Sequence, residues 1–421
     1  MSYRFRQADE KQVMAFIVQK FGGTSVGDID RIKNVALRVK RELDAGNQVV
    51  VAVSAMSGVT NQLDGYCKAI SANVDPVEYD AVVATGEQVT SGLLAMALQN
   101  IGIDARSWSG WQLPLRTDEA HTKARILSIE TTEMLKGVAR GQVQVVAGFQ
   151  GVTAEGRVST LGRGGSDTSA VALAAALQAD RCDIYTDVDG VYTTDPRIVS
   201  KAHKLDKITY EEMLEMASLG AKVLQTRSVE MAMKHRVRLQ VRSTFSDAEG
   251  TLVCDEEEIV EREMISGIAY SRDEAKITLV RVADRPGVAA AIFGPLADAN
   301  VNVDMIVQNI SECGDFTDMT FTVTKGDLNR AVQVLEGCKS DLSYEKLIPD
   351  SNVVKISVIG VGMRSHAGVA QTMFKSLADK AINIEVISTS EIKISVLIKE
   401  EYTELALRAL HTAYGLDAKE Q

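Results

Sequence analysis

Short apolar runs alternate with amphipathic segments over the first 250 residues of the chain. The apolar runs lie at residues 15–18, 48–53, 143–147 and 182–185. Continuous β-branched runs such as residues 48–53 (QVVVAV) are typical of parallel strands that are buried on both faces. Apolar residues recur at helical spacing after Asp28, which predicts a helix that ends at Gly46. A second helix is predicted from about Asp167 to Leu177. We therefore expect an α/β domain with a largely parallel central sheet, because such strands need helical crossovers.

A charged connector and an internal repeat follow this domain. Residues 255–263 (DEEEIVERE) carry mostly acidic side chains, which is typical of a solvated linker. Beyond them, two segments realign so that Lys276 matches Lys355 and Asn302 matches Asn383. Each copy has the pattern of a small βαββαβ-like unit. We predict an N-terminal extension (1–13), an α/β domain (14–254), an acidic linker (255–265) and two repeat units (266–345 and 346–421).

Composition narrows the class of function. The 421 residues include 46 lysines and arginines against 57 acidic residues, a net charge of −11. This balance argues against nucleic acid as the main partner, because neutralising phosphates needs a basic face. The chain has no apolar run of the ~20 residues that span a bilayer, and its start lacks a signal-peptide core. We expect a cytoplasmic protein without a membrane partner, and the five scattered cysteines suggest no zinc or redox motif.

Two glycine-rich loops precede helices, and each carries a cation. The first, Lys20–Ser25 (KFGGTS), follows a strand, where ligands of open parallel sheets bind. The amides of Gly22 and Gly23 can approach an anion closely, although a tight turn beside a surface lysine explains the motif equally well. The second loop, Gly162–Asp167 (GRGGSD), adds an arginine and a capping hydroxyl to three glycines. A capped turn needs fewer of these features, so this loop favours an anion site.

Three further segments have structural explanations of their own. Residues 186–197 (TDVDGVYTTDPR) combine acids, hydroxyls and a ring, but Asp-Gly and Asp-Pro turns account for part of the pattern. Thr85-Gly86-Glu87 can be a helix start with an acid that matches the helix dipole. Lys222 can be a solvated lysine, so none of these segments identifies a site alone.

Together, six motifs make a specific resemblance. In order along the chain they are KFGGTS, SAMSGVTN, TGE, GRGGSD, TDVDGVYTTDPR and GAKVL. This series resembles the aspartate kinases of the amino acid kinase family, and the tandem repeat resembles paired ACT domains, over about residues 14–415. The resemblance implies a three-layer α/β/α kinase domain followed by two ferredoxin-like ACT domains. It also implies transfer of the γ-phosphoryl group of ATP to L-aspartate, giving 4-phospho-L-aspartate on the route to lysine, threonine, methionine and isoleucine.

The resemblance assigns roles to individual residues. Lys20 would hold the transferring phosphoryl group with the amides of Gly22 and Gly23, and Asp167 would orient Lys20 or the substrate ammonium. Arg163 would hold a carboxylate of L-aspartate, and Glu87 would face its ammonium. Ser54, Thr60 and Ser166 complete the aspartate site. The nucleotide site would comprise Thr186, Asp187, Tyr192, Asp195, Arg197 and Lys222. Mg²⁺ would bind mainly through the ATP phosphates, without a protein metal site.

The paired ACT units imply feedback control by end-product amino acids, with lysine and threonine acting together as the first expectation. The effector residues implied are Asp284, Gly287, Asp304, Gln308, Asn309, Asn383, Ile384 and Ser390. ACT units can also serve only as dimer contacts, and a homodimer or larger assembly is expected in either case.

Other interpretations stay open at this point. The chain could be another amino acid kinase, such as an acetylglutamate, glutamate or uridylate kinase, although the ACT pair and Glu87 argue against this. It could also be a catalytically silent effector-binding subunit, but such a subunit would be expected to lose Lys20, Arg163 or Asp167. An ACT-only product could begin at Met264.

Overall fold

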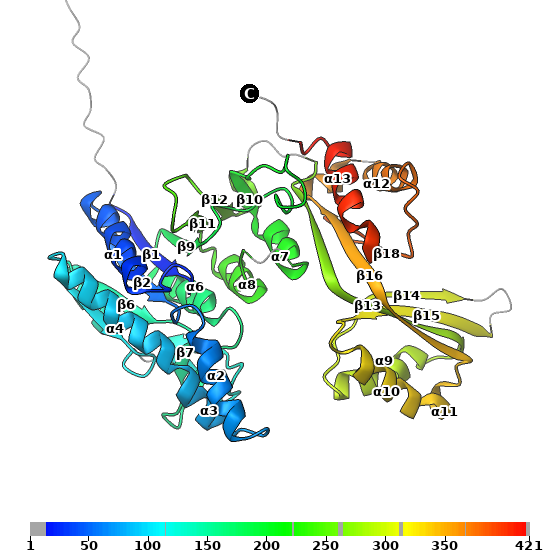
Figure 1. Cartoon of the computed structure of the whole chain (residues 1–421), viewed down its shortest axis with the longest axis horizontal. Helices are drawn as coiled ribbons and strands as arrows, with labels where there is room; N and C mark the ends of the chain where they lie inside the picture. The colour runs from blue at the N-terminus through cyan, green and yellow to red at the C-terminus, as the bar shows by residue number, and fades with distance from the viewer. Residues whose placement is uncertain are drawn as a thin grey trace, which may run out of the picture. The chain divides into compact units, whose positions relative to one another are not determined.

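The structure, a computed structural model, describes two compact units that interleave along the chain (Figure 1). The described residues are 14–113, 115–220, 223–259, 264–310, 315–366 and 368–417. The first unit covers the chain up to Val191, then Lys204–Leu214 and Lys222–Val260, and the second covers Tyr192–His203, Glu215–Ala221 and Glu261–Gln421. Residues 192–203 and 215–221 therefore belong to the second unit, although the sequence groups them with the 14–254 domain.

An eight-stranded sheet forms the centre of the first unit. Its order is β10-β12-β11-β9-β1-β2-β6-β3, and neighbours are parallel except for the pair β11–β12. The strands are β1 (Phe16–Phe21), β2 (Gln48–Val53), β3 (Ala105–Trp108), β6 (Val143–Ala147), β9 (Arg181–Thr186), β10 (Lys207–Thr209), β11 (Leu239–Ser243) and β12 (Thr251–Cys254). The predicted strands at residues 48–53 and 143–147 coincide with β2 and β6. The expectation of a largely parallel central sheet is confirmed.

Helices cover both faces of this sheet. Helices α1 and α4 pack on the face that carries Val49, Val51 and Val53, whereas α6 contacts β1, β2 and β9. Val50 and Ala52, which point to the other face of β2, are equally buried. The helices are α1 (Ile29–Asp44), α2 (Val59–Ile70), α3 (Pro76–Val83), α4 (Thr85–Asn100), α5 (Thr132–Ala139), α6 (Gly165–Leu177), α7 (Tyr210–Ser218) and α8 (Thr226–His235), with the short helix η1 (Glu256–Glu258).

A second, smaller sheet in the same unit carries the hairpin that leads into the GRGGSD loop. Its order is β5-β4-β7-β8, and its strands are β4 (Leu115–Thr117), β5 (Ile126–Ile129), β7 (Gln150–Val152) and β8 (Val158–Thr160). Strand β8 ends directly before Leu161 and the loop, so this sheet fixes one end of the loop.

The second unit is built on a six-stranded antiparallel sheet of order β14-β15-β13-β16-β18-β17. Its strands are β13 (Gly267–Ala283), β14 (Asp304–Ile310), β15 (Phe316–Val323), β16 (Lys346–Ile359), β17 (Val386–Thr389) and β18 (Lys393–Lys399). Its helices are α9 (Val288–Asp298), α10 (Leu328–Gly337), α11 (Lys339–Leu342), α12 (Val369–Ala378) and α13 (Thr403–Ala413), with the short helices η2 (Val361–Ser365) and η3 (Glu400–Tyr402).

The two repeats share the long strands β13 and β16, which run side by side (Figure 1). Residues 276–280 of β13 pair with residues 346–350 of β16, whereas residues 267–271 pair with residues 355–359. Each repeat therefore completes its βαββαβ fold with part of the long strand that begins the other repeat. Contiguous boundaries such as 266–345 and 346–421 do not capture this exchange.

One helical stretch, Pro76–Asn100, has the length and apolar composition needed to cross a membrane. Half of its most apolar window is buried inside the protein. The stretch consists of α3 and α4 and carries two buried acids, Asp80 and Glu87. These features are those of a core helix pair in the first unit.

Candidate active site

Lys20 and Asp167 form an ion pair at the carboxyl edge of the central sheet. Lys20 lies near the end of β1 and Asp167 in the first turn of α6. Lys20 Nζ lies 2.5 Å from Asp167 Oδ1, and each side chain is 11% exposed. Of the two roles that the sequence left open for Asp167, this contact favours orienting Lys20.

The glycines after Lys20 allow a close approach of neighbouring groups. A Cβ atom at Gly22 would lie 3.3 Å from Lys20 Nζ, so any side chain there would press on the lysine head group. A Cβ atom at Gly23 would lie 3.0 Å from the carbonyl oxygen of Ala55, just beyond the end of β2. The KFGGTS loop therefore packs against the end of the neighbouring strand, and a side chain at Gly23 would require a small shift of the Ala55 carbonyl.

Glu87 is the buried acid on the β2 side of this site. It lies in the first turn of α4 and is only 3% exposed. Its Oε1 accepts a hydrogen bond from the backbone N–H of Ala55 (3.0 Å). Its Oε2 is buried and has no hydrogen-bond partner among the residues that the structure describes. Burial raises the pKa of Glu87 to about 7. An acid in this state gains strongly from a cationic ligand, because the ligand would satisfy the free oxygen and stabilise the charge.

Two further aspartate-site candidates lie at the same edge. Ser54 follows β2, and its backbone N–H donates to the carbonyl oxygen of Phe21 (3.0 Å), which joins the ends of β1 and β2. Thr60 is half-buried in the first turn of α2. Both residues are thus close in sequence to Ala55, the residue that contacts both Gly23 and Glu87.

The GRGGSD loop turns sharply into α6. Gly164 adopts a left-handed φ of +68°, and a Cβ atom there would lie 2.1 Å from Cγ of Gln225. Ser166 is buried, and its Cα lies 3.1 Å from the position of a Cβ atom on Gly148, which follows β6. Arg163 is exposed. The loop therefore leaves its guanidinium accessible while burying the first turn of α6, whose free N–H groups favour an anion.

The predicted nucleotide residues do not all fall in one compact unit. Thr186 ends β9, and its hydroxyl donates to the carboxylate of the exposed Asp187 (3.0 Å), both in the first unit. Tyr192, Asp195 and Arg197 belong to the second unit. Lys222 lies outside the described residues. The assignment of these residues to the nucleotide stays a prediction.

In the second unit, Asp195 is held by its neighbours. It accepts hydrogen bonds from the backbone N–H (2.9 Å) and the guanidinium of Arg197 (2.8 and 3.0 Å) and from the Tyr270 hydroxyl (3.3 Å). The hydrogen bonds from Arg197 hold the pKa of Asp195 below its usual value. The first of these contacts is the Asp-Pro turn that the sequence suggested.

The predicted effector residues are distributed over both repeats of the second unit. Asp304 forms an ion pair with Lys355, with 2.7 Å between Lys355 Nζ and Asp304 Oδ2. Asn309 and Ile384 line a cavity of about 260 Å³, together with Glu385, Val307, Thr320, Val386 and Ile387. Gly287 precedes α9 with a φ of +92°. The remaining candidates lie on strands or in loops of this unit: Asp284, Gln308, Asn383 and Ser390.

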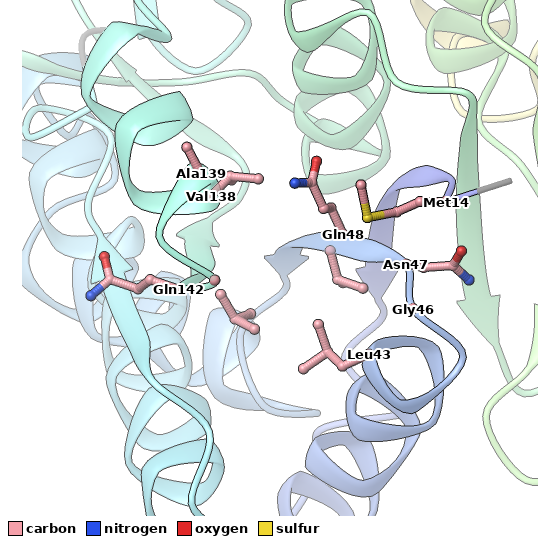
Figure 2. A pocket seen from close by; sticks show the side chains of 11 residues that line it. Met14, Leu43, Gly46, Asn47, Gln48, Val138, Ala139 and Gln142 are labelled. Carbon is pink, nitrogen blue, oxygen red and sulfur yellow. The ribbon is translucent and has the colours of Figure 1, made fainter. Parts of the chain in front are cut away.

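A cavity in the first unit lies elsewhere (Figure 2). Its volume is about 270 Å³, and it opens at the starts of β2 and β6, beside Gln48 and Val143. Since β2 and β6 are parallel, their starts lie at the opposite edge of the sheet from Ser54 and Gly148. The described residues that line it carry apolar or amide side chains. This cavity is therefore separate from the candidate site.

Sequence reasoning missed two sets of residues. Asp80 and Thr160, both buried, and the half-buried His121 form a hydrogen-bonded cluster behind the GRGGSD loop. Lys276 and Lys355 were noticed only as matching positions of the repeat, yet both make ion pairs with acids of the opposite repeat. The matching lysines were the available signal for the second set, whereas nothing local marks the first.

Comparison with known proteins fits this geometry. The profile of the amino acid kinase family matches residues 15–243, and ACT domain profiles match residues 276–339 and 356–414. The aspartate kinase of Stutzerimonas stutzeri is 59% identical over 406 residues, covering 96% of this chain and 98% of that protein. The aspartokinase of Helicobacter pylori is 50% identical over 405 residues, covering 95% and 99%.

Solved structures agree with these relatives. Escherichia coli aspartokinase III in complex with aspartate and ADP (R-state) has a TM-score of 0.79 at 27% identity, covering 94% of this chain and 99% of that one. The same enzyme in complex with lysine and aspartate (T-state) has a TM-score of 0.75 at 26% identity, with the same coverage. Because relatives of 50–59% identity span nearly the whole chain, it belongs to the aspartate kinases, phosphotransferases of the amino acid kinase family that carry two ACT domains.

Proposed function

We propose that the protein transfers the γ-phosphoryl group of ATP to the side-chain carboxylate of L-aspartate, giving 4-phospho-L-aspartate. The observation that carries this proposal is the nearly buried Lys20–Asp167 pair at the carboxyl edge of the sheet. A lysine held there by a helix-start carboxylate suits the binding of a phosphoryl group. The product, 4-phospho-L-aspartate, then feeds the synthesis of lysine, threonine, methionine and isoleucine.

The chemistry asks for positioning and charge neutralisation. The acceptor carboxylate is already ionised at neutral pH, so no general base is needed. Two anions must approach each other, and a cation beside them lowers that barrier. Lys20 and the amides of Gly22 and Gly23 supply this neutralisation, and Asp167 keeps the lysine oriented.

Recognition of L-aspartate uses opposite charges on two elements. Glu87 faces the substrate ammonium, because its buried Oε2 has no hydrogen-bond partner in the described part of the chain. Arg163 holds a carboxylate with its planar guanidinium. Ser54, Thr60 and Ser166 supply hydroxyl groups around the amino acid. The carboxylate of Glu87 and the guanidinium of Arg163 lie on separate elements. Together they select an amino acid that carries an ammonium group and a second carboxylate.

ATP binds as its Mg²⁺ complex, with the ion held mainly by phosphate oxygens. Among the described residues no group of three His, Cys, Asp or Glu side chains is arranged to hold a metal. Thr186, Asp187, Tyr192, Asp195, Arg197 and Lys222 are the residues assigned to the nucleotide. In this proposal the Mg²⁺ ion arrives with the nucleotide, bound to its phosphate oxygens.

The reaction is tested by trapping the acyl phosphate with hydroxylamine in the presence of ATP, Mg²⁺ and L-aspartate. Lys20→Ala should reduce product formation at least 100-fold, because the phosphoryl group loses its cation. Lys33→Ala is the matched control, since Lys33 is an exposed lysine of α1 in the same unit. Turnover on another acid, with none on L-aspartate, would contradict the substrate assignment.

The ACT pair regulates the enzyme by feedback from lysine and threonine, acting together. Support comes from the two ACT profiles and from the lysine complex of E. coli aspartokinase III. Asp304 and the cavity lined by Asn309 and Ile384 supply acidic and polar groups for a zwitterion. A catalytically silent subunit is disfavoured, because Lys20 and Asp167 remain paired.

Asp304→Asn tests this regulation. The concentration of lysine plus threonine that halves activity should rise about tenfold, equivalent to about 1.4 kcal/mol, while uninhibited turnover is unchanged. Asp298→Asn, at the exposed end of α9, is the control. Inhibition equal to the wild type would assign Asp304 to structure alone.

Two further expectations have their own tests. Light scattering of the purified enzyme tests the expected homodimer or larger assembly, and fractionation of cells tests the expected cytoplasmic location.

A further inference from the structure

A fully buried carboxylate lies behind the GRGGSD loop and takes no part in the chemistry proposed above. Asp80 lies in α3, and its side chain is 0% exposed. Its Oδ1 accepts from the Thr160 hydroxyl (2.6 Å), and its Oδ2 accepts from the Thr160 backbone N–H (2.9 Å). Thr160 is the last residue of β8, three residues before Arg163. One end of the loop is thus tied directly to α3.

The same carboxylate also holds a second segment. Its Oδ2 accepts hydrogen bonds from His121 Nδ1 (2.8 Å) and from the backbone N–H of Thr122 (3.0 Å). Thr122 has a φ of +67°, which is strained for a β-branched residue. Such strain persists only where surrounding contacts fix the backbone, and it is often found beside functional sites.

The strained residue Thr122 packs against the start of the GRGGSD loop. The carbonyl oxygen of Thr122 lies 3.0 Å from the position of a Cβ atom on Gly162, which itself has a φ of +77°. Thr122 therefore lies directly against Gly162, the residue before Arg163, with no room for a side chain between them. On the other side, Arg227 donates to the carbonyl oxygens of Leu161 and Ala124, both at 2.8 Å. The loop backbone is fixed although the Arg163 side chain is exposed.

Asp80 is also linked to the other half of the aspartate site. Helix α3 ends at Val83, and α4 begins at Thr85 with Glu87 in its first turn. Gln150 Nε2 donates to the carbonyl oxygen of Ala84 (2.9 Å), which fixes the junction of the two helices. The α3–α4 pair therefore carries the acid for the substrate ammonium and, through Asp80, holds the loop of the arginine for its carboxylate.

We propose that Asp80 is a positioning residue for the amino-acid substrate, setting the separation between Arg163 and Glu87. It acts through Thr160 and Thr122 and does not touch the substrate. The proposal rests on the proposed function, because Arg163 and Glu87 are assigned there to L-aspartate. Its chemical reason is that a carboxylate can accept from all these donors, whereas an amide must present its own N–H₂ group to at least one of them.

The test is Asp80→Asn in the full-length enzyme, with hydroxylamine trapping over ranges of L-aspartate and ATP. We expect the KM for L-aspartate to rise at least tenfold, with the KM for ATP within twofold of the wild type. Thr160→Val, which removes only the hydroxyl contact, should raise the KM for L-aspartate two- to fivefold. Asp44→Asn, an exposed acid of α1 that pairs with Lys40, is the matched control and should change neither constant.

Three outcomes overturn the proposal. The KM for L-aspartate could stay within twofold of the wild type in both variants. Both KM values could rise equally, or only the active fraction could fall with both KM values unchanged, which would indicate a purely structural role. Thr160→Val keeps the test decisive if Asp80→Asn does not fold, as judged by circular dichroism.

Hydrogen exchange of the loop separates this proposal from the proposed function. Amides of residues 160–165 should exchange at least tenfold faster in Asp80→Asn than in wild type or Asp44→Asn, without any substrate present. If the wild type does not phosphorylate L-aspartate, the proposed function fails while this measurement still reports on the tether. Unchanged exchange of the loop in an active enzyme would overturn the positioning role alone.

Discussion

Lys355 of the second ACT repeat pairs with Asp304 of the first, at 2.7 Å between Nζ and Oδ2. The matching lysine of the first repeat, Lys276, pairs in turn with Glu385 of the second. Glu385 occupies the position that corresponds to Asp304, because Asn383 matches Asn302. The repeats are therefore joined by reciprocal ion pairs as well as by shared strands. An effector that binds either acid must compete with a lysine of the other repeat.

Lys355 should be important for the stability of the ACT unit. Its side chain is 7% exposed and also pairs with Glu274 (2.8 Å), whose side chain is 9% exposed. Burial alone would lower the pKa of Lys355, but Glu274 and Asp304 outweigh burial and raise it. Lys355→Met leaves Glu274 buried without its partner, so we expect a loss of about 3–5 kcal/mol.

Urea unfolding of the full-length protein measures this loss. Lys380→Met is the control, because Lys380 is an exposed lysine of the same repeat. Equal unfolding free energies for the two variants would mean that the buried pair contributes no net stability. Such a result would leave the pair a role in register or in effector response only.

Glu87 should make the use of L-aspartate depend on pH near neutrality. Its pKa is about 7 because of burial, so roughly half of the free enzyme carries the neutral acid at pH 7. Only the carboxylate pairs with the substrate ammonium. The kcat/KM for L-aspartate should therefore rise as pH increases through 7 and level off above it.

Glu87→Gln identifies the source of this pH dependence. The variant should lose the rise through pH 7 and lower kcat/KM about 10- to 100-fold, as expected for a lost charge-assisted hydrogen bond of roughly 1.5–3 kcal/mol. Glu130→Gln, an exposed acid of the same unit, should behave as the wild type. Persistence of the rise in Glu87→Gln would assign the titration to another group.

The sequence predicted those parts of the molecule that depend on local pattern. The β-branched run QVVVAV coincides with β2 because an uninterrupted apolar stretch is stable only between two covered faces. The Lys20–Asp167 pair was foreseeable because strand ends and helix starts of a parallel sheet meet at one edge. The matching lysines Lys276 and Lys355 marked these positions as notable, but they did not show that each pairs with an acid of the other repeat.

Other contacts join residues that no local pattern connects. Asp80 and Thr160 are 80 positions apart in the sequence. From the sequence alone, Asp80 could equally well be a solvent-exposed residue of its helix. Assigning residues 192–203 to the second unit also depends on distant contacts. Ile268 donates to the carbonyl oxygen of Thr193 (2.7 Å), and Val199 packs in the core of the second repeat. Tertiary packing, rather than propensity, decides such cases.

His411 should make the second unit less stable in mild acid. It is fully buried, Nδ1 lies 2.9 Å from Asp417 Oδ1, and Nε2 lies 2.9 Å from the Thr193 hydroxyl. Burial lowers its pKa below 6.5, although Asp417 partly opposes the shift. Below pH 6.5 the unfolded chain binds a proton that the folded protein resists, so the unfolding free energy falls as pH drops through 6.5.

Urea unfolding at pH 7.5 and 5.5 tests the contribution of His411. The difference between the two pH values should be smaller in His411→Gln than in the wild type. The hydrogen bond from His411 lowers the pKa of Asp417, but its titration lies below 3.8 and outside this window. An identical pH difference in both proteins would exclude His411 as its source.

Gly164 should be intolerant of a side chain for two separable reasons. Its φ of +68° costs an alanine roughly 1–2 kcal/mol, and a Cβ atom would lie 2.1 Å from Cγ and 2.4 Å from Cβ of Gln225. Relieving that overlap would shift the loop or α8, at a further cost of about 1–3 kcal/mol.

Gly156→Ala is the matched control, because Gly156 has a φ of +79° with no atom of the described residues within 4 Å of its Cβ position. We expect Gly164→Ala to lose more stability in urea unfolding than Gly156→Ala, and to raise the KM for L-aspartate, which the control should leave unchanged. Equal losses in the two variants would mean that backbone strain alone determines the preference for glycine at the start of α6.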